Sequence, residues 1–450
     1  MAQMAQDSVT QTKIGGAAAE ALAQAAADAF SQTSAMPSYA RAQILAKIAA
    51  AIEAEAEAFA RLITEEVKKP IKESRREVAR AIFTFKWAGE EARRFGGELL
   101  PLDLDEASRG RQALTRRAPS GPALFITPFN FPLNLVAHKV APAIAVGAPF
   151  VLKPAPHAPK TAAKLIEAIT GAGWPKDAAG LAIVDNQAAE ALVRDERFAA
   201  LSFTGSAGVG WHLKSIAGKK RVLLELGGNA AVYVDAGADV PWAAARCAWG
   251  SFYYSGQVCI SVQRIYAEEP VYDQFKDLLL KNTAEFKIGD PADEKTDIGP
   301  LISEDAAARV ESWIKEAASG GGKILCGGKR RGAVVEPTIV ENAPASCRLS
   351  CEEAFGPVAV LEKVLSKVHA LDKMAAGRYG LQAGIFTNDL SLAFEAWTRL
   401  PVGGLIVNDI PAFRSDAMPY GGVRDSGTGR EGVRYAMEEM TDLKTLVLKP

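Results

Sequence analysis

The sequence predicts an α/β protein that contains a doubly wound parallel sheet, a second α/β unit and a small β-flap. Three observations support this expectation. Short apolar runs alternate with amphipathic stretches from residue 121 onward, the alternation restarts after Gly227 and Gly228, and two β-rich pieces belong to neither unit. With 450 residues, 48% of them hydrophobic and 23% charged, the chain is long enough to bury more than one core.

The N-terminal part, residues 16–98, predicts a helical lead-in. It is rich in Ala, Glu, Arg and Lys, and apolar side chains recur at helical spacing, as at Ile44 and Ile48. Pro37 and Pro70 interrupt this pattern, so we expect several helices rather than one.

The apolar runs that follow predict five strands with four intervening helices. The expected strands are 123–127 (ALFIT), 149–153 (PFVLK), 181–185 (LAIVD), 200–204 (ALSFT) and 221–226 (RVLLEL), and the expected helices are 133–145, 159–170, 187–194 and 206–216. Strands that alternate with helices in this way lie parallel in a doubly wound sheet.

A second strand-and-helix series begins after the Gly227-Gly228 pair and runs to the glycine-rich segment 421–429. Its expected elements are a strand at 230–235 (AAVYVD), a helix at 242–255, a strand at 261–269 (SVQRIYAEE) and a helix at 271–285. Residues 111–119 and the tail 442–450 are β-rich, and we expect them to pair as a projecting flap. Exposed strand edges are often covered by another subunit, so this flap favours a homo-oligomer.

Composition excludes several classes of protein. Lys plus Arg (52) nearly balance Asp plus Glu (53), so no global field would attract nucleic acid or an anionic membrane. The five cysteines lack the spacing of a disulfide framework or a zinc site, and the four histidines show no metal-ligand spacing. The first residues, MAQMAQDSVTQTKIGG, lack a leader pattern, and no later apolar run reaches membrane-spanning length. We therefore expect a soluble, metal-free protein of the reducing cytoplasm.

Six motifs indicate a resemblance to a known family. They are TPFNFP at 127–132, FTGSAGVG at 203–210, ELGGN at 225–229, SGQVCI at 255–260, EEAFGPV at 352–358 and MPYGGVRDSGTGREG at 418–432. In order and spacing they resemble the aldehyde dehydrogenase superfamily across nearly the whole chain. Within it, the chain is similar to lactaldehyde dehydrogenases and non-phosphorylating glyceraldehyde-3-phosphate dehydrogenases.

The resemblance implies a domain organisation and an activity. It implies a Rossmann-like dinucleotide-binding domain at 1–110 and 120–227, a catalytic domain at 228–425, and an oligomerisation flap at 111–119 and 438–450. The implied activity is the NAD- or NADP-dependent oxidation of an aldehyde to its carboxylic acid. The implied assembly is a homodimer or homotetramer.

Three residues are the expected catalytic groups. Cys259 matches the family nucleophile, whose thiolate adds to the aldehyde carbon; an isolated cysteine would more often be an inert core residue. Asn130 would hold the oxyanion with its side-chain NH2, together with the backbone N–H of Cys259, whereas an isolated Asn between prolines would only stabilise a turn. Glu225 is expected to activate the water that hydrolyses the thioester, although most strand-end glutamates are merely solvated.

The expected dinucleotide site begins with Gly205 and Gly210, which follow a strand and open a helix. Backbone N–H groups and the helix dipole at such a turn suit a pyrophosphate, although a glycine pair alone is a weak signal. Thr204 and Ser206 are expected beside the dinucleotide.

Other expected cofactor contacts rest on the resemblance. Lys153 would reach the adenosine ribose, and Glu353 and Phe355 would hold the nicotinamide ribose and pack beside the ring. Three positions after the lysine, many NAD-specific relatives carry an acidic residue, whereas this chain carries Pro156. No carboxylate would repel a 2′-phosphate there, and His157 is a nearby cation, so the sequence allows NAD or NADP.

The expected substrate contacts are His138, Phe413 and Arg414. Relatives that oxidise succinic-semialdehyde-like substrates carry an arginine where this chain has His138, which disfavours a dicarboxylic semialdehyde. Arg414 favours a small polar or anionic aldehyde, although a loop arginine is commonly only solvated.

Several other functions stay open at this point. A CoA-acylating dehydrogenase would not need the base Glu225, and a semialdehyde dehydrogenase of the same superfamily is the other close alternative. A non-catalytic nucleotide-binding protein is disfavoured because Cys259, Asn130 and Glu225 are all present.

Overall fold

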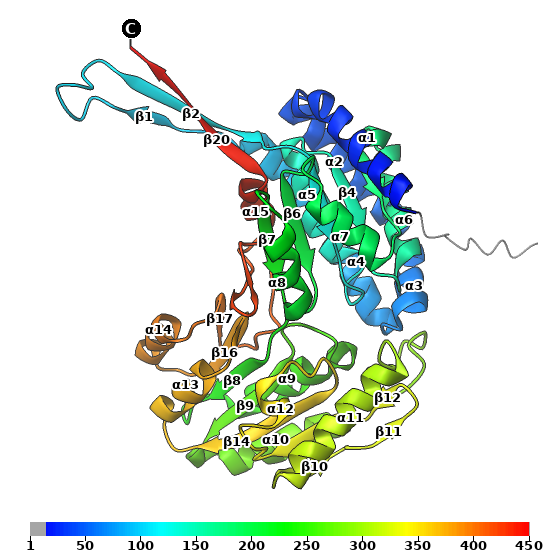
Figure 1. The fold of residues 1–450 in the computed structure, drawn as a ribbon. Helices are drawn as coiled ribbons and strands as arrows, with labels where there is room; N and C mark the ends of the chain where they lie inside the picture. The colour runs from blue at the N-terminus through cyan, green and yellow to red at the C-terminus, as the bar shows by residue number, and fades with distance from the viewer. Residues whose placement is uncertain (1–14, 450) are drawn as a thin grey trace, which may run out of the picture.

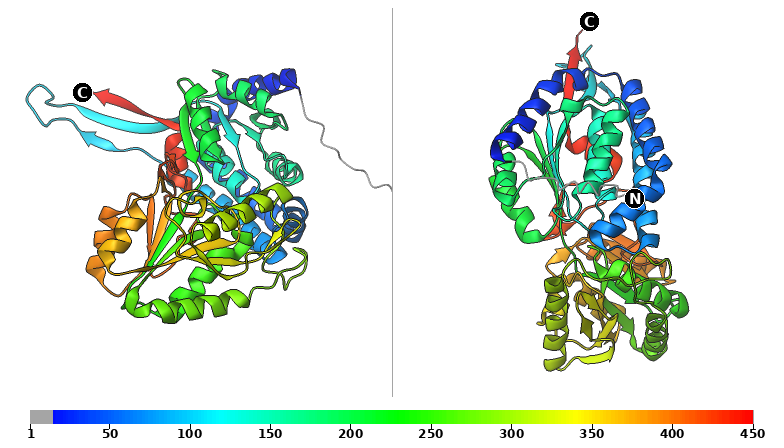
Figure 2. Two further views of the ribbon diagram at one scale, coloured as in Figure 1. Left: turned by 60° about the horizontal axis from the view of Figure 1, so that its bottom comes forward. Right: turned by 90° about the vertical axis from the view of Figure 1, so that its right-hand side faces the viewer.

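The computed structural model describes residues 15–449, which form two lobes with a projecting flap (Figure 1). The views in Figure 2 show the same two lobes and the same projection from other sides. The expectation about a leader falls mainly on residues 1–14, which lie outside the described residues. Within residues 15–449, no helix combines the length and the apolar character that crossing a membrane requires.

The helical lead-in is confirmed as four helices. They are α1 (Gly16–Ser34), α2 (Ser38–Ala54), α3 (Ala56–Val67) and α4 (Ile71–Arg94). Pro37 and Pro70 are the residues that precede α2 and α4, as expected for a residue whose ring fixes φ and which cannot continue a helix.

The first lobe contains the expected parallel sheet. Its strands are β3 (Ala123–Ile126), β4 (Phe150–Lys153), β5 (Ala179–Leu181), β6 (Ala200–Thr204) and β7 (Arg221–Glu225), and its helices are α5 (Asn134–Val146), α6 (Pro159–Gly171), α7 (Asn186–Arg194) and α8 (Ala207–Ile216). The strand order is β19-β7-β6-β3-β4-β5, in which the short β19 (Gly427–Thr428) is antiparallel to β7. The third strand is shorter and starts earlier than the expected 181–185, and its three residues pair with β4 at one edge of the sheet.

Helices cover both faces of this sheet, which makes it doubly wound. Apolar residues of α1 and α7 pack with one face, whereas α2, α4, α5 and α6 pack with the other. The expected α/β fold class is thus confirmed, and the carboxyl ends of β3, β6 and β7 meet at one edge, where ligands of such sheets bind.

The second lobe is built on a seven-stranded sheet with the order β10-β13-β14-β9-β8-β16-β17. Its strands are β8 (Ala230–Val234), β9 (Val262–Glu268), β10 (Lys323–Cys326), β13 (Thr338–Glu341), β14 (Val358–Val364), β16 (Gln382–Phe386) and β17 (Gly404–Val407), and its helices are α9 (Val240–Phe252), α10 (Glu269–Ala284), α11 (Glu304–Ser319), α12 (Arg348–Cys351), α13 (Lys367–Ala375) and α14 (Leu390–Arg399). All pairs are parallel except β10 with β13. The helix expected at 242–255 ends earlier, at Phe252, because the next residues leave the helical conformation.

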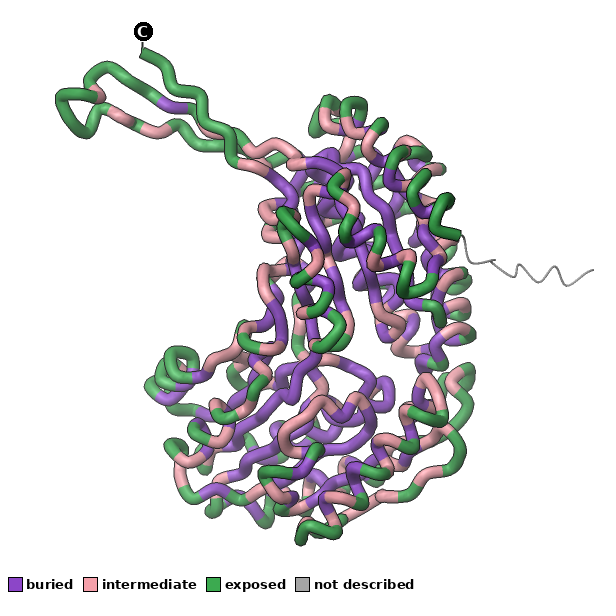
Figure 3. The backbone as a smooth tube through the Cα atoms, in the orientation of Figure 1, coloured by how far each residue is buried: buried purple, intermediate pink, exposed green. Residues whose placement is uncertain are grey.

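The flap is a three-stranded sheet of β1 (Leu99–Pro101), β2 (Gln112–Pro119) and β20 (Thr441–Leu448). The two expected pieces pair antiparallel from Gln112 with Leu448 to Pro119 with Thr441. Strand β1 was not expected from the sequence, and residues 438 and 439 belong to helix α15 (Val433–Glu439) rather than to the flap strand. Figure 3 shows the flap as mostly exposed, in contrast to the buried interior of both lobes.

The Glu77 carboxylate of α4 connects a buried lysine to the first turn of α5. Lys69 and Glu77 are fully buried and form a salt bridge, and Glu77 Oε1 also accepts the backbone N–H groups of Leu133 (2.8 Å) and Asn134 (3.0 Å). These N–H groups lie at the N-terminus of α5 and have no acceptor within the helix. The Glu77 carboxylate therefore caps the helix, and its negative charge interacts favourably with the positive end of the helix dipole. Glu77 therefore fixes the start of α5 and the loop before it.

We expect Glu77→Ala to lower the free energy of unfolding by about 3 kcal/mol or more, because it leaves Lys69 as an unpaired buried charge and removes the acceptor of two N–H groups. Urea denaturation followed by fluorescence measures this loss. The matched control is Glu90→Ala on the same helix, where the exposed pair with Arg93 should contribute less than about 1 kcal/mol. Equal losses in the two variants would contradict the structural role of Glu77.

Candidate active site

A left-handed turn presents Cys259. Tyr254 (φ 49°), Ser255 (φ 53°) and Gly256 (φ 69°) are consecutive residues with positive φ, a conformation that costs energy for residues with a Cβ. The surrounding structure holds this turn, since Ser255 Oγ donates a hydrogen bond of 2.8 Å to Gly299 O. The turn ends α9 and places Cys259 between the two lobes.

Cys259 lies in the wall between two cavities. The glycine-side cavity is lined by Pro128, Phe129, Asn130, Leu135, Thr204, Gly205, Ser206, Ala207, Gly208, Glu225, Leu226, Gly227, Cys259, Arg309, Glu352, Glu353, Phe355, Arg378 and Tyr379. The arginine-side cavity is lined by Glu73, Arg76, Glu77, Arg80, Phe131, Asn134, Leu135, Arg246, Trp249, Tyr253, Val258, Cys259, Ile260, Ala412, Phe413, Arg414 and Tyr420. A ligand on either side can therefore reach the same thiol.

The Cys259 side chain is partly buried and lines both cavities. Its sulfur lies 3.2 Å from the Tyr420 hydroxyl. Burial raises the pKa of Cys259 to about 12, while the Tyr420 hydrogen bond and the Arg414 charge act in the opposite direction. The thiol therefore depends on its neighbours for ionisation.

Asn130 lies beside Cys259 with a fixed side chain. Asn130 is 3% exposed, and its Nδ2 donates a hydrogen bond of 3.0 Å to Gln257 O. An amide NH2 has two hydrogens, so this bond orients the group and leaves the second hydrogen for a ligand oxygen. Gln257 is two residues before Cys259, which links the donor to the turn that carries the thiol.

Glu225 ends β7 and lines the glycine-side cavity. Both of its carboxylate oxygens are buried without a hydrogen-bond partner among the described residues. Burial and the nearby Glu431 charge raise its pKa well above the usual glutamate value, with Arg414 and Lys139 opposing the shift. A carboxylate that keeps its lone pairs unused and binds a proton more strongly suits general-base chemistry.

The Gly227-Gly228 pair permits close approaches that a side chain would block. A Cβ at Gly227 would lie 2.3 Å from Glu353 Oε2, and a Cβ at Gly228 would lie 2.5 Å from Cys259 O. The Gly228 N–H donates a hydrogen bond of 3.1 Å to Glu353 Oε1. These contacts bring Glu225, Glu353 and Cys259 into one site.

The turn after β6 forms one end of the glycine-side cavity. Thr204, Gly205 and Ser206 all line it, and Thr204 Oγ1 is buried without a partner among the described residues. Ser206 precedes α8 but makes no side-chain cap, and a Cβ at Gly208 would meet no atom within 4 Å. Open N–H groups, an unused hydroxyl and space at a helix N-terminus fit a phosphate-containing ligand.

Gly210 has a different position from the other residues of this turn. It does not line the cavity, and a Cβ there would lie 2.3 Å from Leu226 Cδ2. The lack of a side chain at Gly210 therefore allows α8 to pack closely against the end of β7.

The remaining residues expected at the cofactor lie on both lobes. Glu353 and Phe355 line the glycine-side cavity, and Phe355 adopts a positive φ of 48°. Burial raises the pKa of Glu353 to about 7. Lys153 ends β4 and is buried, but it does not line the cavity.

The arginine-side cavity presents four guanidinium groups. Arg80 pairs with Asp416 (2.7 Å), and the other three, Arg76, Arg246 and Arg414, pair with Glu73, Asp409 and Glu431 respectively. An arginine has five N–H donors, so one carboxylate partner does not use them all. Phe413, 47% exposed, lies at the cavity beside Arg414.

His138 does not line the arginine-side cavity. It is fully buried on α5, and its Nε2 lies 2.8 Å from Asp416 Oδ1. Asp416 also accepts from Arg80, so His138 lies behind the cavity wall and supports a group that holds Arg80. Burial lowers the pKa of His138, with the Arg414 charge acting in the same direction.

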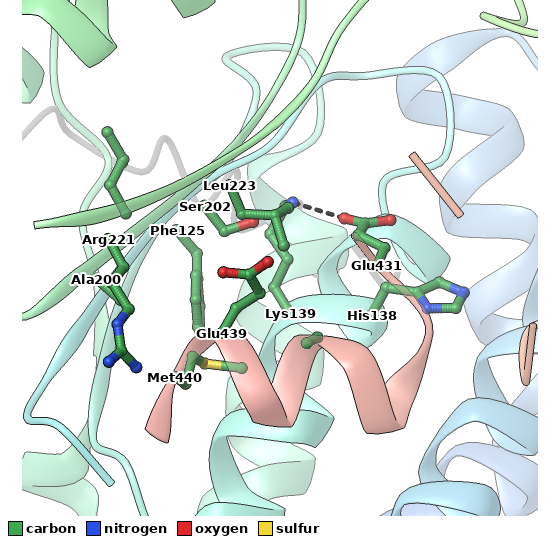
Figure 4. Close-up of a pocket in the computed structure, with 12 residues that line it drawn as sticks. Phe125, His138, Lys139, Ala200, Ser202, Arg221, Leu223, Glu431, Glu439 and Met440 are labelled. Carbon is green, nitrogen blue, oxygen red and sulfur yellow. Dashed lines mark hydrogen bonds and ion pairs between the residues drawn. The ribbon is translucent and has the colours of Figure 1, made fainter. Parts of the chain in front are cut away.

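A buried ionic cluster behind the site was not predicted from the sequence. Glu431 accepts from Lys139 Nζ (2.8 Å) and Arg414 Nη2 (3.0 Å), and the guanidinium of Arg414 lies 3.8 Å from the centre of the Tyr420 ring. Figure 4 shows Lys139 and Glu431 pointing toward one another beside His138 in a small internal cavity. The motif at 418–432 contained Tyr420 and Glu431, but no sequence signal paired Glu431 with Lys139, 292 positions earlier, or Tyr420 with Cys259, 161 positions earlier.

Among residues 15–449, no three His, Cys, Asp or Glu side chains are grouped so that they could hold a metal ion.

Comparisons with known proteins place the chain in a family. The aldehyde dehydrogenase family model matches residues 4–446. The 3-sulfolactaldehyde dehydrogenase of Priestia aryabhattai is 45% identical over 382 residues, which cover 83% of this chain and 79% of that protein.

Two solved structures are also similar. Aldehyde dehydrogenase 21 from Physcomitrella patens, in complex with the reaction product succinate, has a TM-score of 0.95 at 44% identity and covers 97% of this chain and 91% of that one. Glyceraldehyde-3-phosphate dehydrogenase GapN from Methanocaldococcus jannaschii, complexed with NADP, has a TM-score of 0.93 at 38% identity and covers 98% and 96%. The chain belongs to the aldehyde dehydrogenase family and is an NAD(P)-dependent aldehyde dehydrogenase.

Proposed function

We propose that this enzyme oxidises a small polar or anionic aldehyde to its carboxylic acid through a thioester on Cys259. The observation that carries the proposal is the position of Cys259 in the wall between a cavity suited to a dinucleotide and a cavity that presents four arginines. The named relatives act on related compounds, since they include a 3-sulfolactaldehyde and a glyceraldehyde-3-phosphate dehydrogenase.

The proposed chemistry assigns one step to each catalytic residue. The Cys259 thiolate adds to the aldehyde carbon, and the second amide hydrogen of Asn130 and the Cys259 backbone N–H hold the oxyanion that forms. Oxidation of this adduct leaves an acyl group on the sulfur as a thioester. Glu225 then takes a proton from a water molecule that adds to the thioester carbon, the C–S bond breaks, and the acid leaves while Cys259 regains its thiolate.

We propose NAD or NADP as the cofactor in the glycine-side cavity. When bound, its nicotinamide supplies the hydride acceptor. The unpartnered Thr204 hydroxyl, the open space at Gly208 and the uncapped start of α8 fit its phosphates, and Glu353 and Phe355 on the opposite wall would hold the ribose and ring. Lys153 at the end of β4 is proposed to contact the adenosine ribose.

We also propose a homodimer or homotetramer assembled through the flap. Leu114, Leu443, Leu446, Val447 and Leu448 are exposed on its strands. Apolar side chains on a projecting sheet favour coverage by a second copy.

A dicarboxylic semialdehyde is the second candidate substrate. The structure of aldehyde dehydrogenase 21 contains succinate, the product of such a reaction, and that protein is 44% identical to this chain. Against this candidate, His138 stands where semialdehyde-oxidising relatives have an arginine and lies behind the cavity wall. A panel of anionic aldehydes separates the two candidates by their kcat/KM.

We expect Glu225→Gln to act after oxidation and not before it. The variant should release about one equivalent of reduced cofactor per active site in a rapid burst and then stall, because the amide cannot take the proton from water. Stopped-flow absorbance of the reduced cofactor measures the burst, and Cys259→Ala is the control that should show none. Loss of the burst together with turnover would place Glu225 in thiolate activation and contradict the assignment.

We expect the enzyme to accept NADP, because the exposed Pro156 carries no charge to repel a 2′-phosphate. Pro156→Glu should lower kcat/KM for NADP roughly tenfold or more relative to NAD, by placing a carboxylate beside that phosphate. Pro156→Gln is the matched control, since it changes size and polarity without the charge. An unmodified enzyme without NADP turnover would show that shape, not charge, selects the cofactor.

We expect Arg414→Ala to lower kcat/KM for anionic aldehydes about tenfold more than for a neutral short alkanal, because hydrogen bonds to charged groups contribute more than neutral ones. The ratio between the two substrates is the informative quantity. Any loss through the packing of Arg414 on Tyr420 affects both substrates alike and cancels in that ratio. If the ratio stays constant, Arg414 has no part in recognising the anion.

A further inference from the structure

The Tyr420 hydroxyl makes a direct contact with the reacting sulfur. Tyr420 lies in the segment between β17 and β18 (Val423–Arg424), and its hydroxyl is 3.2 Å from Cys259 Sγ. No other side chain among residues 15–449 hydrogen-bonds this sulfur. Tyr420 is 3% exposed, so few solvent molecules can compete with the sulfur for its hydroxyl.

The backbone and a cation hold the ring in place. Tyr420 and Glu431 exchange two backbone hydrogen bonds, Tyr420 N–H to Glu431 O (3.0 Å) and Glu431 N–H to Tyr420 O (2.6 Å). The Arg414 guanidinium covers the ring face at 3.8 Å, and Glu431 together with Lys139 fixes Arg414. The position of the hydroxyl is therefore set by groups that are themselves buried and paired.

The groups that face Cys259 have opposite effects on the pKa of its thiol. Glu225 from the end of β7 and Glu353 after α12 place negative charge near the sulfur, and Tyr253 lines the arginine-side cavity together with Cys259. Burial and these carboxylates disfavour the thiolate. Tyr420, by its hydrogen bond, and Arg414, by its charge, favour it.

We infer that Tyr420 is a catalytic residue, whose O–H donates a hydrogen bond to the Cys259 sulfur, stabilises the thiolate and fixes the direction from which the sulfur attacks the aldehyde. The inference rests on the proposed function, in which Cys259 is the nucleophile. A phenol is suited to this task because it donates one hydrogen bond while remaining uncharged at neutral pH.

Arg414 has a second effect on the nucleophile under this inference. A cation over an aromatic face is attracted to the electron density of the ring, and it withdraws that density from the hydroxyl. The phenol then donates more strongly to the sulfur. The sequence of contacts Lys139, Glu431, Arg414, Tyr420 and Cys259 thus connects the buried ionic cluster to the reacting atom.

The test is the pH dependence of Cys259 alkylation in the full-length Tyr420→Phe enzyme, without aldehyde or cofactor. Iodoacetamide forms a C–S bond with the thiolate and releases iodide, so the rate follows the thiolate fraction. Mass spectrometry of the Cys259 peptide isolates this residue from the other cysteines. We expect the alkylation rate to be about tenfold lower at each pH on the acidic side of the profile, which corresponds to a rise of about one unit in the pKa of Cys259.

The control variant is Tyr272→Phe on α10, which removes the hydroxyl of another buried tyrosine, bonded to Glu341 at 2.7 Å. Its alkylation profile should match that of the unmodified enzyme. Circular dichroism checks that both variants keep their fold, which is expected because each loses one oxygen atom.

Two results separate the inference from the proposed function. If Tyr420→Phe shows the same profile as the unmodified enzyme, Tyr420 only packs beside the sulfur and the inference is overturned. If the unmodified enzyme turns over an aldehyde but Cys259→Ala does so equally well, Cys259 is not the nucleophile and the proposed function fails, whatever the alkylation profile shows.

Discussion

The buried carboxylate of Glu431 is the constraint on which the rest of the site depends. It is shared by Lys139 from α5 of the first lobe and Arg414 from the long segment after β17. A buried charge is tolerated only where partners of opposite sign are held in place, so this pairing fixes the segment that crosses between the lobes. The same charge contributes to the raised pKa of Glu225 and, through Arg414, sets the ring of Tyr420 beside Cys259.

Glycines provide the second constraint, because three chain segments approach more closely than a Cβ allows. Gly228 brings the end of the β7 segment against the Cys259 carbonyl, and Gly421 brings the late segment to within contact of Glu225, where a Cβ would lie 2.9 Å from Oε1. A Cβ at Gly403 would lie 1.6 Å from Gly421 O. The glycines of the ELGG and PYGG motifs are thus required for steric reasons, whichever residues take part in the reaction.

The fold and the groups that meet at Cys259 could be predicted because their signals are local. Strand and helix periods predicted the first lobe and the first two strands and helices of the second. Cys259, Asn130 and Glu225 lie in short motifs whose family context gives each an expected role. The flap pairing also followed from two β-rich pieces. Strand β1 is three residues long and has too short a pattern to detect.

What could not be predicted is the pairing of buried charges across the fold. The partners of His138, Lys139 and Arg80 lie far along the chain, at Asp416 or Glu431, and no periodicity connects residues at such separations. His138 was expected at the substrate because its motif position suggested it, whereas the structure directs its ring to Asp416. The role of Tyr420 was missed for the same reason, because it depends on the contact of its hydroxyl with the distant Cys259 sulfur.

The central claim is that Cys259 carries the acyl group between the two cavities. The most direct measurement is peptide mass spectrometry of Glu225→Gln enzyme quenched after one turnover with an aldehyde substrate and cofactor. The account predicts the added acyl mass on the peptide that contains Cys259, and its removal by hydroxylamine, which cleaves thioesters. Acyl mass on another cysteine, or release of reduced cofactor with no acylated peptide, would contradict the account.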